Sequence, residues 1–235
     1  MRVPQQSVSV KRPVNPLGRS MKIKAICFDM DGTLIRNTDS VRYLCTLNDN
    51  LKELEEIECF ENERSISWTE ADYLKAELIR GLELGKVEDR FEDNVELIQN
   101  IGQVLTYLRG RRIRSVLVTA GPTQVADILG MKFGFDGVYG SIYEVKNQKF
   151  TGQITTHMGN AGKLNRLEHF CDNNSIRLNH CVAIGDGESD VDVFGKCGKS
   201  IAINFTDTLE GKASEYVTTN DLSDIIDILE SWLAA

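Results

Sequence analysis

Hydrophobic positions along the chain fall into two kinds of segment. Short runs of apolar and β-branched residues occupy 22–28, 113–119, 181–187, 200–205 and 215–219. Each run is typical of a buried strand. The intervening segments place apolar residues three and four positions apart, which predicts helices. Strands that alternate with helices predict an α/β fold with a doubly wound, mostly parallel sheet.

Helical spacing dominates residues 37–110 and returns later in the chain. The later helices are expected over 123–133, 160–172 and 221–233. One segment departs from this alternation of strand and helix. Residues 141–154 alternate apolar and polar positions on both sides of residues 146–148, and this pattern predicts a β-hairpin.

The formal net charge of −8 is unevenly distributed over the 235 residues. Residues 1–20 hold four basic residues, no acidic one and three of the four prolines, so we expect them to form a disordered basic tail. Subtracting +4 from −8 leaves −12 on the rest of the chain. An acidic body repels nucleic acid and anionic membranes, so neither is an expected partner. No apolar run approaches the ~20 residues of a membrane-spanning helix.

Two further features of composition bear on location and organisation. The six cysteines form no CxxC pair, which excludes the common zinc and redox motifs and favours a reducing, cytoplasmic location. The basic tail leaves organellar targeting open as an alternative. Residues 37–96 hold seventeen acidic and seven basic residues. Such a run is typical of solvent-exposed helix faces, and an acidic cap over a site is the functional alternative.

Carboxylates follow the first and third predicted strands. Asp29 and Asp31 flank Met30 after the first strand, and Asp186 follows the third, with Asp190 four residues further on. The carboxyl ends of strands in a doubly wound sheet meet at a ligand-binding crevice. Carboxylates that are close together persist mainly when a cation lies among them, and an all-oxygen set favours Mg²⁺ or Ca²⁺. Mg²⁺ suits this set best, because it leaves positions for water and phosphate.

The second strand and the following helices supply groups that suit an anion. Thr119 offers a hydroxyl, and Ala120 and Gly121 offer backbone amides at the start of a helix. Gly121 and Pro122 are expected to end the strand. Lys163 can place a positive charge near the same anion. A cation, amides and a lysine around a carboxylate indicate phosphoryl transfer to that carboxylate.

In order and spacing these motifs resemble the four motifs of the haloacid dehalogenase superfamily: FDMDGTLI, the VTAG strand end, Lys163 and GDGESD. The resemblance implies a phosphatase in which Asp29 is the nucleophile that forms an aspartyl-phosphate. It implies that Asp31 protonates the leaving oxygen and then activates water. The implied phosphate-binding residues are Thr119, Ala120 and Lys163, and the implied Mg²⁺ ligands are Asp29, Asp31 through its backbone carbonyl, Asp186 and Asp190.

The resemblance also implies two domains, and it is strongest to the phosphoserine phosphatase branch. Residues 21–36 and 106–235 would form the Rossmann-like core, and residues 37–105 a helical cap. Three features depart from that branch: Thr38 stands in place of a usual glutamate, Ala120-Gly121-Pro122 replaces a run with two glycines, and Ser189 replaces an asparagine. Lys75 and Arg80 are the candidates to bind a substrate carboxylate.

We therefore expect hydrolysis of a small-molecule phosphomonoester. Phosphoserine is one candidate, and sugar, polyol and amino-alcohol phosphates are others. A phosphomutase or phosphotransferase is an alternative, and a non-hydrolytic, Mg²⁺-binding receiver-like protein is another. The sequence predicts no oligomeric state.

Several residues outside the motifs are expected to be structural. His157, His169 and His180 have no partner spacing and are expected at the surface. Trp68 either lines the substrate entrance or packs a cap helix, and packing is favoured.

Overall fold

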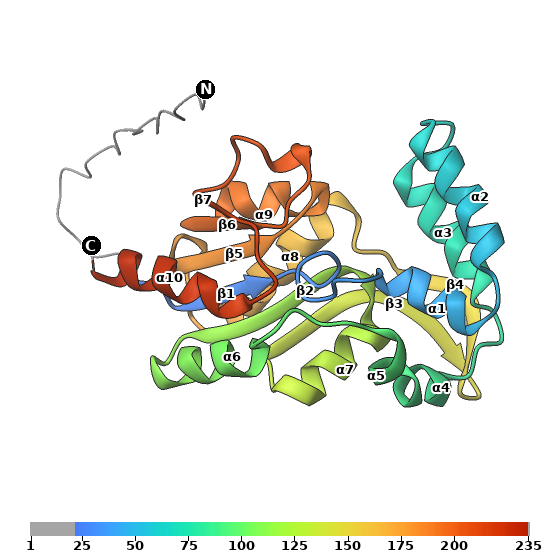
Figure 1. The fold of residues 1–235 in the computed structure, drawn as a ribbon, viewed down its shortest axis with the longest axis horizontal. Coiled ribbons are helices and arrows are strands. Elements are labelled where there is room, and N and C mark those ends of the chain that lie inside the picture. Colours follow the sequence, from blue (N-terminus) through green and yellow to red (C-terminus); the bar gives the residue numbers. More distant parts are fainter. Residues whose placement is uncertain (1–21, 235) are drawn as a thin grey trace, which may run out of the picture.

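The computed structural model describes residues 22–234 as a central sheet covered by helices (Figure 1). The predicted tail at 1–20 lies outside the described residues. The strands are β1 (Ala25–Phe28), β2 (Arg114–Pro122), β3 (Gly137–Lys146), β4 (Lys149–Thr156), β5 (Cys181–Gly185), β6 (Lys199–Ile203) and β7 (Glu215–Val217). Their order is β4-β3-β2-β1-β5-β6-β7, and every neighbouring pair is parallel except β3 and β4. The expected doubly wound α/β fold and the hairpin are therefore confirmed.

Helices cover both faces of this sheet and also extend beyond its edge. They are α1 (Ser40–Leu47), α2 (Leu51–Asn62), α3 (Trp68–Leu78), α4 (Leu84–Asp89), α5 (Phe91–Asn94), α6 (Ile101–Gly110), α7 (Thr123–Phe133), α8 (Gly159–Asn173), α9 (Val191–Lys196) and α10 (Ile225–Ala234). None of the helices within residues 22–234 is long and apolar enough to cross a bilayer.

The central strand β1 is buried on both faces, as its continuous apolar sequence predicts. Ile26 and Phe28 pack in one hydrophobic cluster with α6, α7 and α10. Ala25 and Cys27 point to the opposite face and pack in a second cluster with α8 and α9. This period-two alternation orients the residues that follow β1 relative to both helical layers.

The predicted helical region 37–110 contains six helices separated by specific breaks. Chain reversal after α3 requires a positive φ of 83° at Gly81, which a glycine adopts without steric cost. The segment 95–100 is not helical, and α6 begins only after Asn100, whose φ is 62°. Asparagine tolerates this left-handed conformation better than most residues. Apolar spacing alone does not reveal such breaks.

Helices α2 and α3 project away from the sheet, beside α1 (Figure 1). The chain after α3 returns to the sheet and pairs with β4. The amides of Gly81 and Leu84 donate to the carbonyls of Phe150 and Gln148 at 2.8 Å each, and the Phe150 amide donates to the Leu82 carbonyl at 3.0 Å. The division into a core and a cap at 37–105 stays a proposal. Helix α6 spans that boundary and packs in the apolar cluster of the sheet.

Strand β2 ends at Pro122 and α7 begins at Thr123, so Gly121 and Pro122 end the strand as predicted, although the strand runs past residue 119. Pro122 lies opposite Ser141 on β3, after a register shift that follows Val118. This shift frees the backbone between these positions from the regular ladder while the strand direction is kept. The residues in this irregular stretch, Thr119–Gly121, belong to the site described next.

Candidate active site

Three carboxylates meet at the carboxyl ends of β1 and β5. Asp29 follows β1, Asp186 follows β5, and Asp190 lies in the short turn before α9. One oxygen from each lies within 4.8 Å of the others. Strands β1 and β5 are neighbours, and the order of the strands along the chain reverses between them, which is the usual ligand position in such sheets.

Lys163, from the first part of α8, reaches into this group. Its Nζ lies 2.5 Å from Asp29 Oδ1 and 2.9 Å from Asp190 Oδ1. Asp190 is also held by the amides of Asp186 and Gly187, at 3.1 and 3.3 Å. The Lys163 side chain is only 2% exposed. A buried ammonium of this kind persists because it is paired with carboxylates.

Burial shifts the pKa values of the clustered groups. It raises the pKa of Asp29 to about 6, although Lys163 opposes this rise. Burial, together with the negative charges of Asp29 and Asp190, raises the pKa of Asp186 to about 8. Burial alone would lower the pKa of Lys163, but Asp190 and Asp29 raise it well above its ordinary value. One lysine therefore leaves the three carboxylates short of positive charge, as in a cation-binding site.

Gly32 allows this close arrangement. Its φ is +76°, and a Cβ atom at this position would lie 2.0 Å from Asp186 Oδ2. A side chain at residue 32 would therefore displace the Asp186 carboxylate or the turn that carries Asp31. This is the physical role of the glycine in the Asp-Met-Asp-Gly motif.

The Asp31 carboxylate is bound to the start of α1. Its Oδ1 accepts from the Ser40 amide at 2.8 Å, and its Oδ2 accepts from Ser40 Oγ at 2.6 Å. Burial and then the nearby charge of Asp39 raise the pKa of Asp31 to about 7, against the hydrogen bonds from Ser40. A carboxyl group with this pKa can both donate and accept a proton near neutral pH. Ser40 lies outside the four motifs and was not among the predicted site residues.

The end of β2 supplies the groups predicted to hold an anion. Thr119 is buried, and its Oγ1 accepts from the Gly121 amide at 3.0 Å. The hydroxyl hydrogen of Thr119 remains available for a ligand. Gly121 packs so closely that a Cβ there would lie 2.3 Å from Ser40 Oγ and 2.8 Å from Asp31 Oδ2. Ala120 and Gly121 line the pocket that opens beside Asp31.

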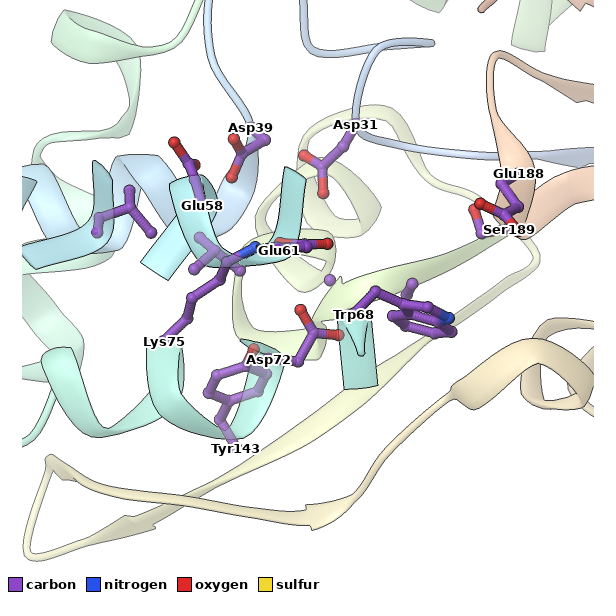
Figure 2. Close-up of a pocket in the computed structure, with 14 residues that line it drawn as sticks. Asp31, Asp39, Glu58, Glu61, Trp68, Asp72, Lys75, Tyr143, Glu188 and Ser189 are labelled. Atoms are coloured by element: carbon purple, nitrogen blue, oxygen red, sulfur yellow. Dashed lines mark hydrogen bonds and ion pairs between the residues drawn. The ribbon is translucent and has the colours of Figure 1, made fainter. Parts of the chain in front are cut away.

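This pocket has a volume of about 320 Å³ and lies between the strand ends and helices α1–α3 (Figure 2). Its lining includes six carboxylates, those of Asp31, Asp39, Glu58, Glu61, Asp72 and Glu188. Lys75 also lines the pocket, and its Nζ lies 2.7 Å from Glu61 Oε2. Arg80, the other residue predicted to bind a substrate carboxylate, forms an ion pair with Glu77 and does not line the pocket.

His157 is not a surface residue, contrary to the prediction. Its side chain is 7% exposed, and its Nε2 lies 2.8 Å from Asp72 Oδ2 on α3. The ring packs between Trp68 and Tyr73, at centroid distances of 5.2 and 5.5 Å. Trp68 packs against His157, as favoured, and it also lines the pocket, which was the alternative. Sequence spacing does not reveal this contact, because His157 and Asp72 lie 85 positions apart.

His169 is exposed, as predicted, and His180 is partly buried.

The structure brings the predicted site residues together in two groups. Asp29, Lys163, Asp186 and Asp190 form one group. Asp31 and Ala120 lie at the pocket beside it.

Several known proteins are similar to this chain in sequence. The chain is 25% identical over 224 residues to a phosphoserine phosphatase of Archaeoglobus fulgidus, covering 94% of this chain and 63% of the relative. It is 25% identical over 208 residues to one of Methanocaldococcus jannaschii, covering 87% of this chain and 97% of the relative. The chain spans half of another, from Streptomyces coelicolor. It therefore spans about half to two thirds of some of these relatives and nearly all of others.

Solved structures show the same fold. A phosphoserine phosphatase in its apo form matches with a TM-score of 0.76 and 25% identity, over 88% of this chain and 98% of the other. A hydrolase of the same superfamily from Salmonella enterica matches with a TM-score of 0.81 and 17% identity, over 88% and 72%. The model of the haloacid dehalogenase-like hydrolases matches residues 26–194, well over half of the sequence. The strand-end carboxylates and the buried lysine agree with this match, and the chain belongs to the haloacid dehalogenase-like hydrolase family.

Proposed function

We propose that this protein is a Mg²⁺-dependent phosphatase that hydrolyses a small phosphomonoester through an aspartyl-phosphate on Asp29. The observation that carries the proposal is the position of Asp29. It lies at the end of β1 against Lys163, beside Asp186 and Asp190, with Asp31 two residues further on at the pocket. The phosphoserine phosphatases among its relatives support the reaction class.

The described residues fit Mg²⁺. Asp29, Asp186 and Asp190 present carboxylate oxygens to one another, and the raised pKa of Asp186 indicates a deficit of positive charge there. All-oxygen donor sets are what Mg²⁺ prefers in proteins. Asp29 and Asp186 would hold the ion, together with the Asp31 backbone carbonyl, and Asp190 would orient the set. When bound, Mg²⁺ would neutralise negative charge on the phosphate and on the attacking carboxylate.

In the first step the Asp29 carboxylate attacks phosphorus. The bond between phosphorus and the ester oxygen breaks as the bond from Asp29 forms, and the leaving oxygen takes the proton of Asp31. Lys163 and the Thr119 hydroxyl hold the phosphate oxygens, together with the amides after Thr119. Because Ser40 holds both oxygens of Asp31, this carboxyl group keeps a fixed orientation toward the pocket.

In the second step water attacks the aspartyl-phosphate. The Asp31 carboxylate, now deprotonated, removes a proton from that water. Inorganic phosphate leaves, and both Asp29 and Asp31 return to their starting states. A hydrolase of this kind requires water only at this step. The helices over the pocket limit the water that reaches the intermediate.

The experiment is phosphate release from a panel of phosphomonoesters, phosphoserine and p-nitrophenyl phosphate included, with Mg²⁺ and with EDTA. We expect release that depends on Mg²⁺. Added acceptor alcohols separate hydrolysis from phosphotransfer, since a transferase would form new esters in place of free phosphate. Absence of release from every ester, by protein whose folding is verified, would refute the proposal.

Mg²⁺ should also stabilise the folded chain. At about one hundred times its Kd, a ligand that binds only the folded state adds about 2.7 kcal/mol. For a chain of this size that corresponds to a rise of about 5–10 °C in the unfolding midpoint. Thermal unfolding with Mg²⁺ and with EDTA measures it.

The matched control is Asp186→Asn, which keeps the size of the side chain. This variant should lose most of the rise produced by Mg²⁺. An equal rise in both proteins would place the ion elsewhere in the molecule.

A further inference from the structure

The charged side chains in the pocket beside Asp31 indicate the chemistry of the leaving group, which is the part of the substrate that departs with the ester oxygen. Since phosphorus would lie near Asp29, the leaving group extends past Asp31 into this pocket. Its volume of about 320 Å³ lies at the small end of the range for ligand pockets, which suits a small leaving group.

The two cations near this pocket are already paired. Lys75 Nζ lies 2.7 Å from Glu61, and the Arg42 guanidinium contacts Glu58. Within residues 22–234, Lys75 is the only lysine or arginine that lines the pocket, and Arg42 does not line it. A substrate carboxylate would thus have to compete with Glu61 for Lys75 and would lie among acidic side chains. Like charges in a partly enclosed site repel strongly.

Four pocket carboxylates, in contrast, form no ion pair with a lysine or arginine in the described part of the chain: Asp31, Asp39, Asp72 and Glu188. Asp72 accepts only from His157 Nε2, and Glu188 makes no ion pair. Burial raises the pKa of Asp72, and the hydrogen bond from His157 and the charge of Lys75 only partly oppose that rise. Asp72 is therefore a partly desolvated carboxylate that a cation would stabilise.

Aromatic rings accompany these carboxylates. Trp68 and Tyr143 line the same pocket, and Figure 2 shows Trp68 beside Asp72. The faces of tryptophan and tyrosine rings attract ammonium groups. Asp31 and Glu188 approach the pocket from the sheet side, whereas Glu58, Glu61 and Asp72 approach it from α2 and α3 (Figure 2).

We infer that the substrate is an amino-alcohol phosphate, whose leaving group carries an ammonium and no carboxylate, with the ammonium held by Asp72 against Trp68. This inference rests on the proposed phosphatase function and specifies its substrate class. The pocket is poorly suited to a phosphorylated amino acid, because the carboxylate of such a substrate finds no unpaired lysine or arginine among the described residues that line it.

The test uses the full chain with Mg²⁺ and four phosphate esters. Phosphoethanolamine carries the ammonium alone, and phosphoserine adds a carboxylate. Ethylene glycol phosphate replaces the ammonium by a neutral hydroxyl, and p-nitrophenyl phosphate reports activity without regard to charge. We expect kcat/KM for phosphoethanolamine to exceed that for phosphoserine and for ethylene glycol phosphate by at least about tenfold.

The outcomes separate the two proposals. No release from any of the four esters would overturn the phosphatase function and this inference together. Release in which phosphoserine or ethylene glycol phosphate equals or exceeds phosphoethanolamine would overturn the inference alone. A polyol phosphate that surpasses all four would have the same meaning, because carboxylates can also bind hydroxyl groups.

Variants locate the ammonium. Asp72→Asn should lower the ratio of kcat/KM for phosphoethanolamine to that for ethylene glycol phosphate by about tenfold. Glu188→Gln should lower the same ratio by a smaller factor, since that side chain is exposed. The ratio is independent of the fraction of folded enzyme, so partial unfolding of either variant does not affect it.

The matched control is Glu56→Gln, on the exposed side of α2 and outside the pocket. It removes one negative charge from the same part of the molecule and should leave the ratio unchanged. An equal fall in Glu56→Gln and Asp72→Asn would show a general charge effect and would overturn the assignment to Asp72.

Discussion

Replacing Asp29 with asparagine should lower kcat for phosphate release by at least about 10⁴-fold, because the amide cannot form the acyl-phosphate bond. The side chain keeps its size. Lys163 keeps its contact with Asp190, at 2.9 Å, so the fold should persist. Initial rates with the best ester of the panel, at saturating Mg²⁺, measure the effect.

The control for this variant is Asp127→Asn on α7. It makes the same chemical change at an exposed position outside the pocket, and it should keep the full rate. The unfolding midpoint of Asp29→Asn should also stay within a few degrees of that of the original protein. A loss of less than about tenfold in Asp29→Asn would exclude Asp29 as the nucleophile.

The second large effect concerns stability. Lys163→Met should lower the free energy of unfolding by about 3–5 kcal/mol, since it leaves Asp29 and Asp190 buried without their shared ammonium. This loss corresponds to a fall of about 10 °C in the unfolding midpoint. Thermal unfolding in EDTA measures it, and added Mg²⁺ should restore part of the loss by supplying positive charge.

Two further lysine variants serve as controls for this result. Lys163→Arg keeps the charge and should lose less stability than Lys163→Met. Lys196→Met removes an exposed lysine near the end of α9 and should change the midpoint little. If Lys163→Met unfolded at the same temperature as the original chain, the buried ion pairs would contribute no net stability.

The strand-end residues could be predicted from the sequence because their positions follow from local patterns. Asp29, Thr119 and Asp186 each come at or just after the end of a continuous apolar run, and parallel strands bring such ends to one edge. Lys163 could be placed through its motif. The contact of its Nζ with Asp190 as well as Asp29 could not be predicted, because it depends on how α8 packs on the sheet.

The pocket walls could not be predicted in this way. Ser40 and His157 act through partners on other elements, at Asp31 and Asp72. Their sequence neighbourhoods carry no distinctive spacing. The acidic character of residues 37–96 was visible, but only the packing of α2 and α3 separates the carboxylates that face the pocket from those in solvent. The breaks at Gly81 and Asn100 depend on single left-handed residues, which hydrophobic periodicity does not register.

The backbone pairing between residues 81–84 and β4 also bears on self-association. Strand β4 is the last strand on its side of the sheet, and an unpaired edge strand is a template for pairing with other chains. The hydrogen bonds of Gly81, Leu82 and Leu84 occupy part of that edge. At the opposite edge β7 is only three residues long, which itself limits such pairing. Deletion of α1–α4 would uncover the β4 edge, so the segment that shapes the pocket also protects the sheet against aggregation.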